Sequence, residues 1–306
     1  MVLGAVSQSP HTIVGLGELL WDRLPGGERL GGAPANVVYH ASVLGDRGVL
    51  ATRVGADAAG DEALRLLGER GVDVSTVQRD TDRATGTACV SLSSAGEPGF
   101  TFDMTAAWTG LAWTDQWRGL LAAVDVLCFG TLLCSQPAGR DLLRRAARVV
   151  PAAALRLLDL NLRLPYTTDE AVEAALACAN ALKLSEEEAR ALAVRFGVVD
   201  AAAWLVENRG LRIVAVTRGA RGSLLYTAGG RLEHHGAPLD APEQGADPVG
   251  AGDAFTAALV HHLVRGHSPQ RAGAAANRYA AFVASRAGAM PDIPEPVRWQ
   301  VRRGGA

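Results

Sequence analysis

The segment Asp247–Phe255 has the clearest capacity for chemistry in this sequence and reads Asp-Pro-Val-Gly-Ala-Gly-Asp-Ala-Phe. Gly250, Ala251 and Gly252 are small and stand directly before a predicted helix. Backbone N–H groups at such a helix start can approach a bound anion closely, and the helix dipole adds partial positive charge. The loop could therefore stabilise a phosphoryl group during transfer. Asp253, in the first helical turn, would then accept the proton of the acceptor hydroxyl.

The same segment has a simpler interpretation, a glycine-rich turn followed by an ordinary acidic residue at a helix start. A helix N-terminus also favours ionised Asp253, which would make it a weaker base. Since a loose phosphoryl-transfer transition state needs little early deprotonation, Asp253 would orient the hydroxyl and take its proton late. Gly250–Phe255 and Gly15–Leu20 both lack the third glycine of a dinucleotide-binding fingerprint, which argues against a dehydrogenase.

Lys183 is the only lysine of the chain and follows Leu182. A Walker A loop needs a Gly-Lys pair, so a P-loop nucleotide site is excluded.

The composition is that of one large α/β domain, with 306 residues, 48% of them hydrophobic and 20% charged. The formal net charge is −2 and no block of like charges occurs, so neither nucleic acid nor a membrane is an expected partner. No apolar run approaches the roughly 18 residues that span a bilayer, and no signal-peptide pattern opens the chain. We expect a cytoplasmic protein with reduced cysteines, because no CxxC pair occurs among Cys89, Cys128, Cys134 and Cys178.

Apolar runs of strand length recur along the chain, at 12–16, 48–52, 87–92, 124–129, 155–160, 211–217 and 223–226. Helix-like stretches separate several of them, most clearly at 58–70, 137–149, 168–179, 186–195 and 200–208. This alternation predicts a Rossmann-like, doubly wound and mostly parallel sheet with helices on both faces. Two long helices are expected at 251–265 and 269–286.

Segments 18–30 and 84–104 contain short β-like pieces that do not fit the alternation. We expect them to form a small sheet that projects from a single domain spanning residues 1–306. Ligands of open α/β sheets bind at the carboxyl ends of the strands. A small sheet placed there would be a lid that excludes water from the reaction.

Six segments match motifs of one kinase family in order along the chain: Gly17–Asp22, Gly31–Asn36, Leu158–Arg163, Lys183–Glu188, Thr217–Gly222 and Asp247–Phe255. The last resembles the D-T-x-G-A-G-D-x-F signature of ribokinase-like (PfkB-type) carbohydrate kinases. The second and fifth resemble the G-G-x-x-x-N element and the T-x-G-x-x-G nucleotide loop of that family. The other three resemble its fructokinase branch, including that branch's D-x-N-x-R and K-x-S-x-E-E segments.

The resemblance implies a ribokinase-like α/β domain with a lid, which transfers the γ-phosphoryl of ATP to a sugar hydroxyl with Mg²⁺. Asp253 matches the catalytic base, and the anion hole matches Gly250, Ala251 and Gly252. The positions matching sugar contacts or polar groups near the acceptor are Asp22, Gly32, Asn36, Asn161 and Arg163.

For the nucleotide, the resemblance implies contacts at Lys183, Ser185, Thr217, Gly219, Gly222 and Asn277. Ser185 and Glu188 match an N-x-x-E element, so Glu188 is expected to hold Mg²⁺ through water. Asp247 and the stretch Ala284–Gly288 match a site for a monovalent cation, K⁺. Pro248 replaces the usual threonine there, fixing φ and removing an N–H, so weak or absent K⁺ activation is expected.

Some of these residues also have purely structural interpretations. Asp22 could belong to a turn before Pro25, and Asn36 could cap a helix that begins near Val37. Asn161 and Arg163 could be a loop pair that bridges backbone groups.

The leading interpretation is a kinase that binds ATP and a small sugar, acts on a primary hydroxyl of fructose, and forms a homodimer through the lid. No basic cluster in the N-terminal sugar elements would match an already phosphorylated sugar. Kinases for ribose, a sugar acid or a nucleoside stay open, because Arg163 could pair with a carboxylate and Phe102–Trp108 departs from fructokinases. A non-catalytic sugar or nucleotide binder is opposed by the retained Asp253 and its glycines.

Overall fold

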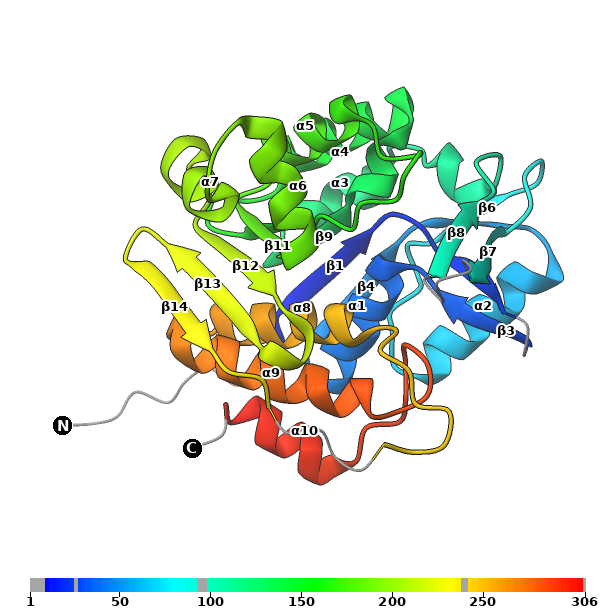
Figure 1. Ribbon diagram of the computed structural model, residues 1–306. Coiled ribbons are helices and arrows are strands. Elements are labelled where there is room, and N and C mark those ends of the chain that lie inside the picture. The colour runs from blue at the N-terminus through cyan, green and yellow to red at the C-terminus, as the bar shows by residue number, and fades with distance from the viewer. Residues whose placement is uncertain (1–8, 25–26, 93–97, 238–241, 305–306) are drawn as a thin grey trace.

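The computed structural model describes residues 9–24, 27–92, 98–237 and 242–304, and its centre is one large sheet (Figure 1). The strand order is β14-β13-β12-β11-β10-β9-β1-β4. In chain order the strands are β1 (Thr12–Leu16), β4 (Arg47–Ala51), β9 (Val126–Gly130), β10 (Leu155–Asp159), β11 (Ala181–Ser185), β12 (Ile213–Thr217), β13 (Ser223–Thr227) and β14 (Gly230–His234). The strands from β4 to β12 pair in parallel, whereas β13 and β14 are antiparallel additions at one edge.

Helices cover both faces of this sheet, as the sequence predicted (Figure 1). One face carries α1 (Ala33–Val43), α8 (Ala251–Leu263), α9 (Pro269–Ala284) and α10 (Glu295–Arg302). The other face carries α3 (Asp115–Leu121), α4 (Pro137–Val149), α5 (Asp169–Cys178), α6 (Glu186–Phe196) and α7 (Ala201–Arg209). Neighbouring strand residues point to opposite faces, so Ile13 packs in the first core and Val14 in the second. Burial on both faces explains why the central strands are almost entirely apolar.

A second, four-stranded sheet stands beside the carboxyl end of β1 (Figure 1). It comprises β2 (Leu20–Leu24), β3 (Gly27–Gly31), β7 (Gly86–Leu92) and β8 (Pro98–Phe102), in the order β3-β2-β7-β8. Near it lie α2 (Ala58–Glu69) and the two short strands β5 (Arg53–Gly55) and β6 (Gln78–Asp80). The chain passes directly from β1 into β2, which brings segment 17–22 from the large sheet to the small one.

The helices predicted from periodicity begin and end within two residues of the observed bounds. Strands β11 and β14 of the large sheet, the short strands β5 and β6, and helices α3 and α10 were not predicted, and the start of α1 was placed wrongly. The apolar pattern of β11 is interrupted by the buried Lys183, and β14 is a polar edge strand. Helix α1 begins at Ala33, not near Val37, because Pro34 is compatible with a first helical turn. Asn36 therefore lies inside the helix and is not its cap. Asp22 lies within β2, so its interpretation as a turn residue is also wrong.

No helix in the described ranges is long and apolar enough to cross a membrane.

Candidate active site

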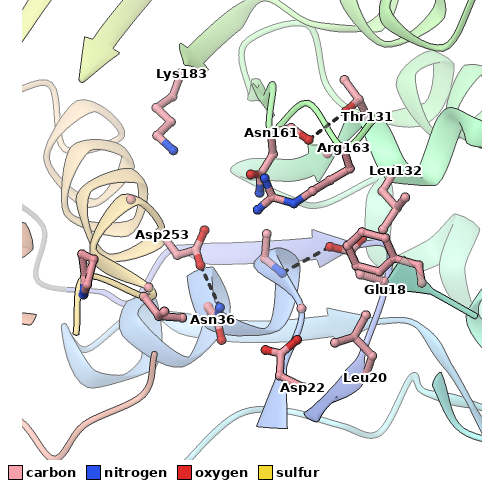
Figure 2. A pocket seen from close by; sticks show the side chains of 18 residues that line it. Glu18, Leu20, Asp22, Asn36, Thr131, Leu132, Asn161, Arg163, Lys183 and Asp253 are labelled. Carbon is pink, nitrogen blue, oxygen red and sulfur yellow. Dashed lines mark hydrogen bonds between the residues drawn. The ribbon is translucent and has the colours of Figure 1, made fainter. Parts of the chain in front are cut away.

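A cavity of about 260 Å³ lies where the carboxyl ends of the central strands meet the small sheet and the start of α8 (Figure 2). Its walls come from chain segments that are far apart in sequence: the β1–β2 connection, the first turn of α1, the loop after β10, β11, and the loop before α8. The carboxyl edge of a parallel sheet is where open α/β folds bind their ligands. The sugar, anion-hole and base candidates converge here, namely Asp22, Gly32, Asn36, Asn161, Arg163, Gly250, Gly252 and Asp253.

Asp253 is buried in the first turn of α8, with its carboxylate facing this cavity. Asn36 Nδ2 donates a 2.7 Å hydrogen bond to Asp253 Oδ2. Burial, followed by the nearby charge of Asp159, raises the pKa of Asp253 to about 7, against the opposing charge of Lys183. The sequence had indicated a lowered pKa from the helix N-terminus. That prediction is wrong, because burial outweighs the dipole, and a carboxyl near neutrality is better suited to accept a proton at neutral pH.

The loop before Asp253 has the shape of an anion site. Gly250 is the N-cap of α8 with a φ of 78°, a left-handed conformation that glycine adopts freely. A side chain there would also collide with Ala289, because an added Cβ would lie 2.5 Å from its Cα. Ala251 and Gly252 follow in the helix. Ala251 N already donates to Pro248 O at 3.2 Å, whereas Gly252 N has no backbone acceptor in the described part of the chain. The Gly252 N–H is therefore available to an anion at the mouth of the cavity.

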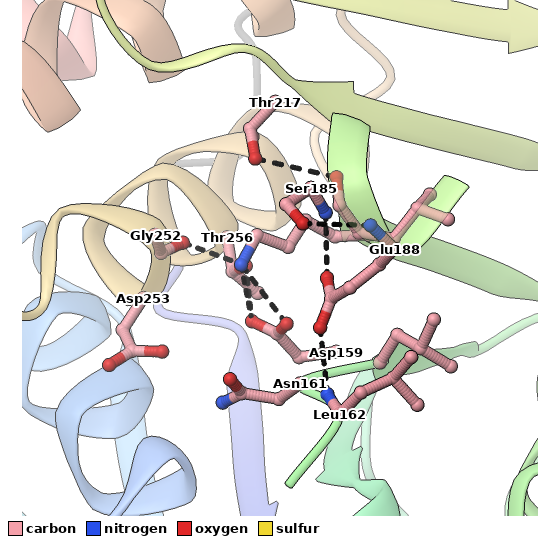
Figure 3. Close-up of polar contacts among 12 residues, drawn as sticks. Asp159, Asn161, Leu162, Ser185, Glu188, Thr217, Gly252, Asp253 and Thr256 are labelled. Atoms are coloured by element: carbon pink, nitrogen blue, oxygen red, sulfur yellow. Dashed lines mark hydrogen bonds and ion pairs between the residues drawn. The ribbon is translucent and has the colours of Figure 1, made fainter. Parts of the chain in front are cut away.

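The only lysine of the chain lies against this loop. Lys183 Nζ contacts both carboxylate oxygens of Asp159, at 3.0 and 3.2 Å, and Thr256 Oγ1 donates to Asp159 Oδ2 at 3.3 Å (Figure 3). An added Cβ on Gly252 would lie 2.8 Å from Lys183 Nζ. Burial opposes the charge of Lys183, but Asp159 and the other nearby carboxylates outweigh it and raise its pKa. A permanent positive charge therefore stands beside the anion loop.

Glu188 joins two of the loops that form the site (Figure 3). Its Oε2 accepts a 2.7 Å hydrogen bond from Ser185 N, and its Oε1 accepts one of 2.7 Å from Leu162 N. Ser185 Oγ in turn accepts from Glu188 N at 3.1 Å, which completes a capping box at the start of α6. Each carboxylate oxygen has a second lone pair that can accept from water. No group of three or more His, Cys, Asp or Glu side chains in the described part of the chain is placed to hold a metal ion.

The candidate sugar contacts line opposite walls of the cavity. Burial raises the pKa of Asp22 to about 6, with the charge of Arg163 opposing the rise. Gly31 leaves room for this carboxylate, since an added Cβ would lie 2.2 Å from Asp22 Oδ2. Asn161 has a φ of 47°, a left-handed conformation that asparagine tolerates better than most residues. Carboxylate and carboxamide groups of this kind match the hydroxyls of a polyol.

A second cavity, of about 420 Å³, adjoins the first through Pro248 and Gly252, which line both. Four predicted nucleotide residues are brought together there, Thr217, Gly219, Gly222 and Asn277. Its remaining walls are mainly small or apolar side chains, including Phe255, Ala280, Ala281 and Ala284. An apolar slot that ends at a helix N-terminus fits a nucleobase with its phosphates directed to the anion loop. Ser185 is not in this cavity, and Lys183 lines the first cavity instead.

Sequence reasoning gave no role to two buried carboxyl groups of the site. Glu18 lines the first cavity together with Leu20 and Asp22, every second residue of the segment that leads into β2. This period of two is the available signal, because alternate residues of a strand share a face. Asp159 stands in the segment that resembles D-x-N-x-R, but its partner Lys183 comes from another strand. Only the parallel pairing of β10 with β11 places the two opposite each other.

A family model described as pfkB family carbohydrate kinase matches residues 26–296. This chain belongs to that family. The resemblance found in the sequence is thereby confirmed. Among similar proteins, a probable fructokinase-4 of Arabidopsis thaliana is 30% identical over 95% of this chain and 96% of its own length. A fructokinase of Klebsiella pneumoniae is 30% identical over 91% of this chain and 95% of its own.

Solved structures confirm the ribokinase-like fold of this PfkB kinase. An uncharacterized sugar kinase from Pyrococcus horikoshii, in complex with ATP, superposes with a TM-score of 0.80 at 24% identity and covers 95% of this chain and 99% of its own. A fructokinase from Vibrio cholerae O395, in fructose, ADP and calcium ion bound form, has a TM-score of 0.78 at 24% identity, covering 95% and 98%.

The candidate cation ligand of this PfkB kinase is already paired with an arginine. Asp247 Oδ2 accepts from Arg29 Nη1 of β3 at 2.8 Å and from Gly288 N at 3.2 Å, while Oδ1 accepts from Val249 N at 3.1 Å. The two segments predicted to form a cation site do lie together, since Asp247 N donates to Arg286 O at 3.1 Å. The negative charge of Asp247, which lies between these segments, is paired with the guanidinium of Arg29.

Replacing Na⁺ with K⁺ at constant ionic strength is expected to change kcat little. The physical reason is that Arg29 already neutralises Asp247, and Pro248 removes an N–H from the same loop. The measurement is kcat for ATP-dependent sugar phosphorylation in matched sodium, potassium and choline chloride buffers. A large increase in potassium alone would contradict this reading of Asp247.

Proposed function

We propose that this PfkB carbohydrate kinase transfers the γ-phosphoryl of ATP to a primary hydroxyl of a free ketohexose, with fructose as the first choice. The observation that carries the proposal is the cavity of about 260 Å³ that places Asp253 and the anion loop beside hydrogen-bonding side chains. This volume lies below the ~300–1,000 Å³ of drug-sized ligand sites, which favours a small sugar over a nucleoside. Relatives named fructokinase, at 30% identity, support the choice of fructose.

In the proposed reaction, the acceptor occupies the first cavity and the nucleotide the second. Asp22, Asn36 and Asn161 hold sugar hydroxyls, so that one primary hydroxyl points to Asp253. ATP supplies the phosphoryl group, which passes between the cavities at Gly250–Gly252. The Gly252 N–H and the Lys183 ammonium stabilise charge on the oxygens of the phosphoryl group. Asp253 accepts the hydroxyl proton as the new P–O bond forms and the bond from the γ-phosphorus to the β,γ-bridging oxygen breaks, so that ADP leaves.

Several other assignments belong to this proposal. Glu188 would hold Mg²⁺ through water, because its carboxylate oxygens already accept backbone N–H groups and Mg²⁺ keeps much of its hydration shell. The sheet β3-β2-β7-β8 would act as the lid of the sugar cavity, since Leu20, Asp22 and Phe102 line that cavity from it. Dimerisation through this lid stays a prediction.

A sugar acid is the second candidate acceptor, because Arg163 lines the same cavity and an arginine can bind a carboxylate. The carboxylates of Asp22 and Asp253 in that cavity oppose an anionic acceptor.

A panel of acceptors tests the proposal: kcat/KM for fructose, ribose, tagatose, adenosine and a ketodeoxy sugar acid at saturating ATP and Mg²⁺. We expect fructose to give the highest value, because a site built from hydrogen bonds rejects analogues that leave a buried polar group unpaired. An acceptor that exceeds fructose by about tenfold or more would overturn the choice of sugar and leave the kinase assignment intact. If none of these acceptors is phosphorylated, the proposed reaction itself is overturned.

A further inference from the structure

Glu18 is a buried carboxyl group in the wall of the acceptor cavity. It stands in the connection between β1 and β2, is 6% exposed, and lies beside the first turn of α1 (Figure 2). The backbone around it is held firmly, because an added Cβ on Gly32 would lie 2.5 Å from Glu18 O. The backbone of Glu18 is therefore packed directly against the backbone that begins α1.

The two carboxyl oxygens of Glu18 have different surroundings. Oε1 accepts a 3.2 Å hydrogen bond from Ala33 N at the start of α1. Oε2 is buried and has no hydrogen-bond partner among the described residues. Buried polar atoms are nearly always paired, so an orphan in a cavity wall points to a partner that arrives with the ligand.

The protonation state of Glu18 decides what that partner can be. Burial raises its pKa to about 7, against the backbone N–H groups of Glu18 and Ala33 and the charge of Arg163. The other charged groups of the cavity are Asp22 on β2, Lys183 on β11 and Asp253 on α8. Because Oε1 already accepts an N–H, the proton of the neutral form resides on Oε2. The orphan atom is therefore a hydrogen-bond donor below neutral pH.

We propose that Glu18 is a specificity-determining residue that donates a hydrogen bond from Oε2 to the ring or carbonyl oxygen of the acceptor sugar, an oxygen that can only accept. The inference rests on the proposed function, because it assumes a neutral polyol in this cavity. The protonated Glu18 side chain is then a donor, whereas Asp22 and Asn161 offer acceptor oxygens. The two walls of the cavity therefore bind different atoms of the sugar. Loss of the Oε2 proton leaves two lone pairs facing the sugar oxygen and weakens binding.

The consequence is a rise in KM for the sugar as pH increases through about 7. The KM for ATP should not follow, because Glu18 does not line the nucleotide cavity. Titration of Asp253 in the same range acts on kcat, so the two groups are separated by measuring KM and kcat independently.

Glu18→Gln is the decisive variant. A glutamine amide keeps an oxygen that accepts from Ala33 N and places a permanent N–H donor at the position of Oε2. If Glu18 served only to hold the start of α1, this variant would leave the pH dependence of sugar KM unchanged. Glu28→Gln is a matched control, because Glu28 lies on β3, is exposed, and pairs with Arg23 outside the cavity.

The experiment measures KM for fructose and for ATP between about pH 5.5 and 8.5 in the wild type, E18Q and E28Q. We expect sugar KM to rise several-fold with pH in the wild type and E28Q and to stay nearly constant in E18Q. If sugar KM in E18Q changes with pH as it does in the wild type, the inference is overturned. A sugar KM that does not change with pH in the wild type also overturns it, and this second result does not depend on the folding of any variant. If another sugar of the panel is the substrate, the same comparison is made with it. Absence of turnover with every sugar would instead overturn the proposed function, and this inference with it.

Discussion

Asp253→Asn is expected to lower kcat by about 10²–10⁴ while the affinity for ATP stays close to that of the wild type. Asparagine keeps the shape of the side chain but cannot accept the hydroxyl proton. The nucleotide cavity is lined by Ala251, Gly252 and Phe255 but not by Asp253, so nucleotide binding should persist. The measurements are single-sugar steady-state kinetics and calorimetric titration with ATP.

The pH profile gives an independent check of the same assignment. A base acts in its ionised form, so kcat of the wild type should rise as pH increases through the Asp253 pKa of about 7 and level off above it. The residual kcat of D253N should show no such rise. Asp115→Asn is a control at another helix start, since Asp115 is exposed and pairs with Arg118 of its own helix. If D253N kept the kcat of the wild type, the assignment of Asp253 as the base would be wrong.

Lys183→Met is expected to lower kcat by about 10²–10³, the usual effect of removing one group that stabilises developing negative charge. The ammonium lies beside Gly252 of the anion loop, and its charge is secured by Asp159. The single variant would also leave Asp159 as an uncompensated buried charge, which costs about 3–5 kcal/mol of stability.

A double variant separates the catalytic effect from this loss of stability. Asp159→Asn combined with Lys183→Met removes both charges and should recover most of the free energy of unfolding, measured by urea denaturation. Its kcat should remain as low as that of the single variant. A double variant with wild-type kcat would show that the pair serves only the packing of β10 against β11.

The parts of the site that could be predicted from sequence are those with local causes. The Gly250–Gly252 loop, the helix that follows it and the Thr217–Gly222 loop combine small residues with a helix or strand boundary, which is a signal within one segment. Strand β11 was missed because a lysine interrupts its apolar run, and that lysine is acceptable only because Asp159 faces it from β10. Asp159 lies 24 residues away from Lys183 in the sequence, too far for a local pattern to connect the two.

Electrostatics was the least predictable property. The helix N-terminus, visible in the sequence, indicates a lowered pKa for Asp253, whereas burial raises it. Burial arises from the joining of α1, α8 and the loop after β10, so it is a property of the folded chain. The same holds for Glu18, whose sequence context shows a carboxyl group at strand spacing but not the orphan oxygen that gives it a role.

The hydrogen bond between Asn36 and Asp253 joins positions 217 residues apart. Closing so long a stretch of chain costs conformational entropy, and non-local contacts of this kind slow folding. During synthesis on a ribosome, α1 emerges long before α8, so a chain that ends before residue 251 has Asn36 but not the proposed base. Until the last fifth of the chain has been made, a nascent molecule therefore has the acceptor wall of α1 without the carboxyl group that completes it.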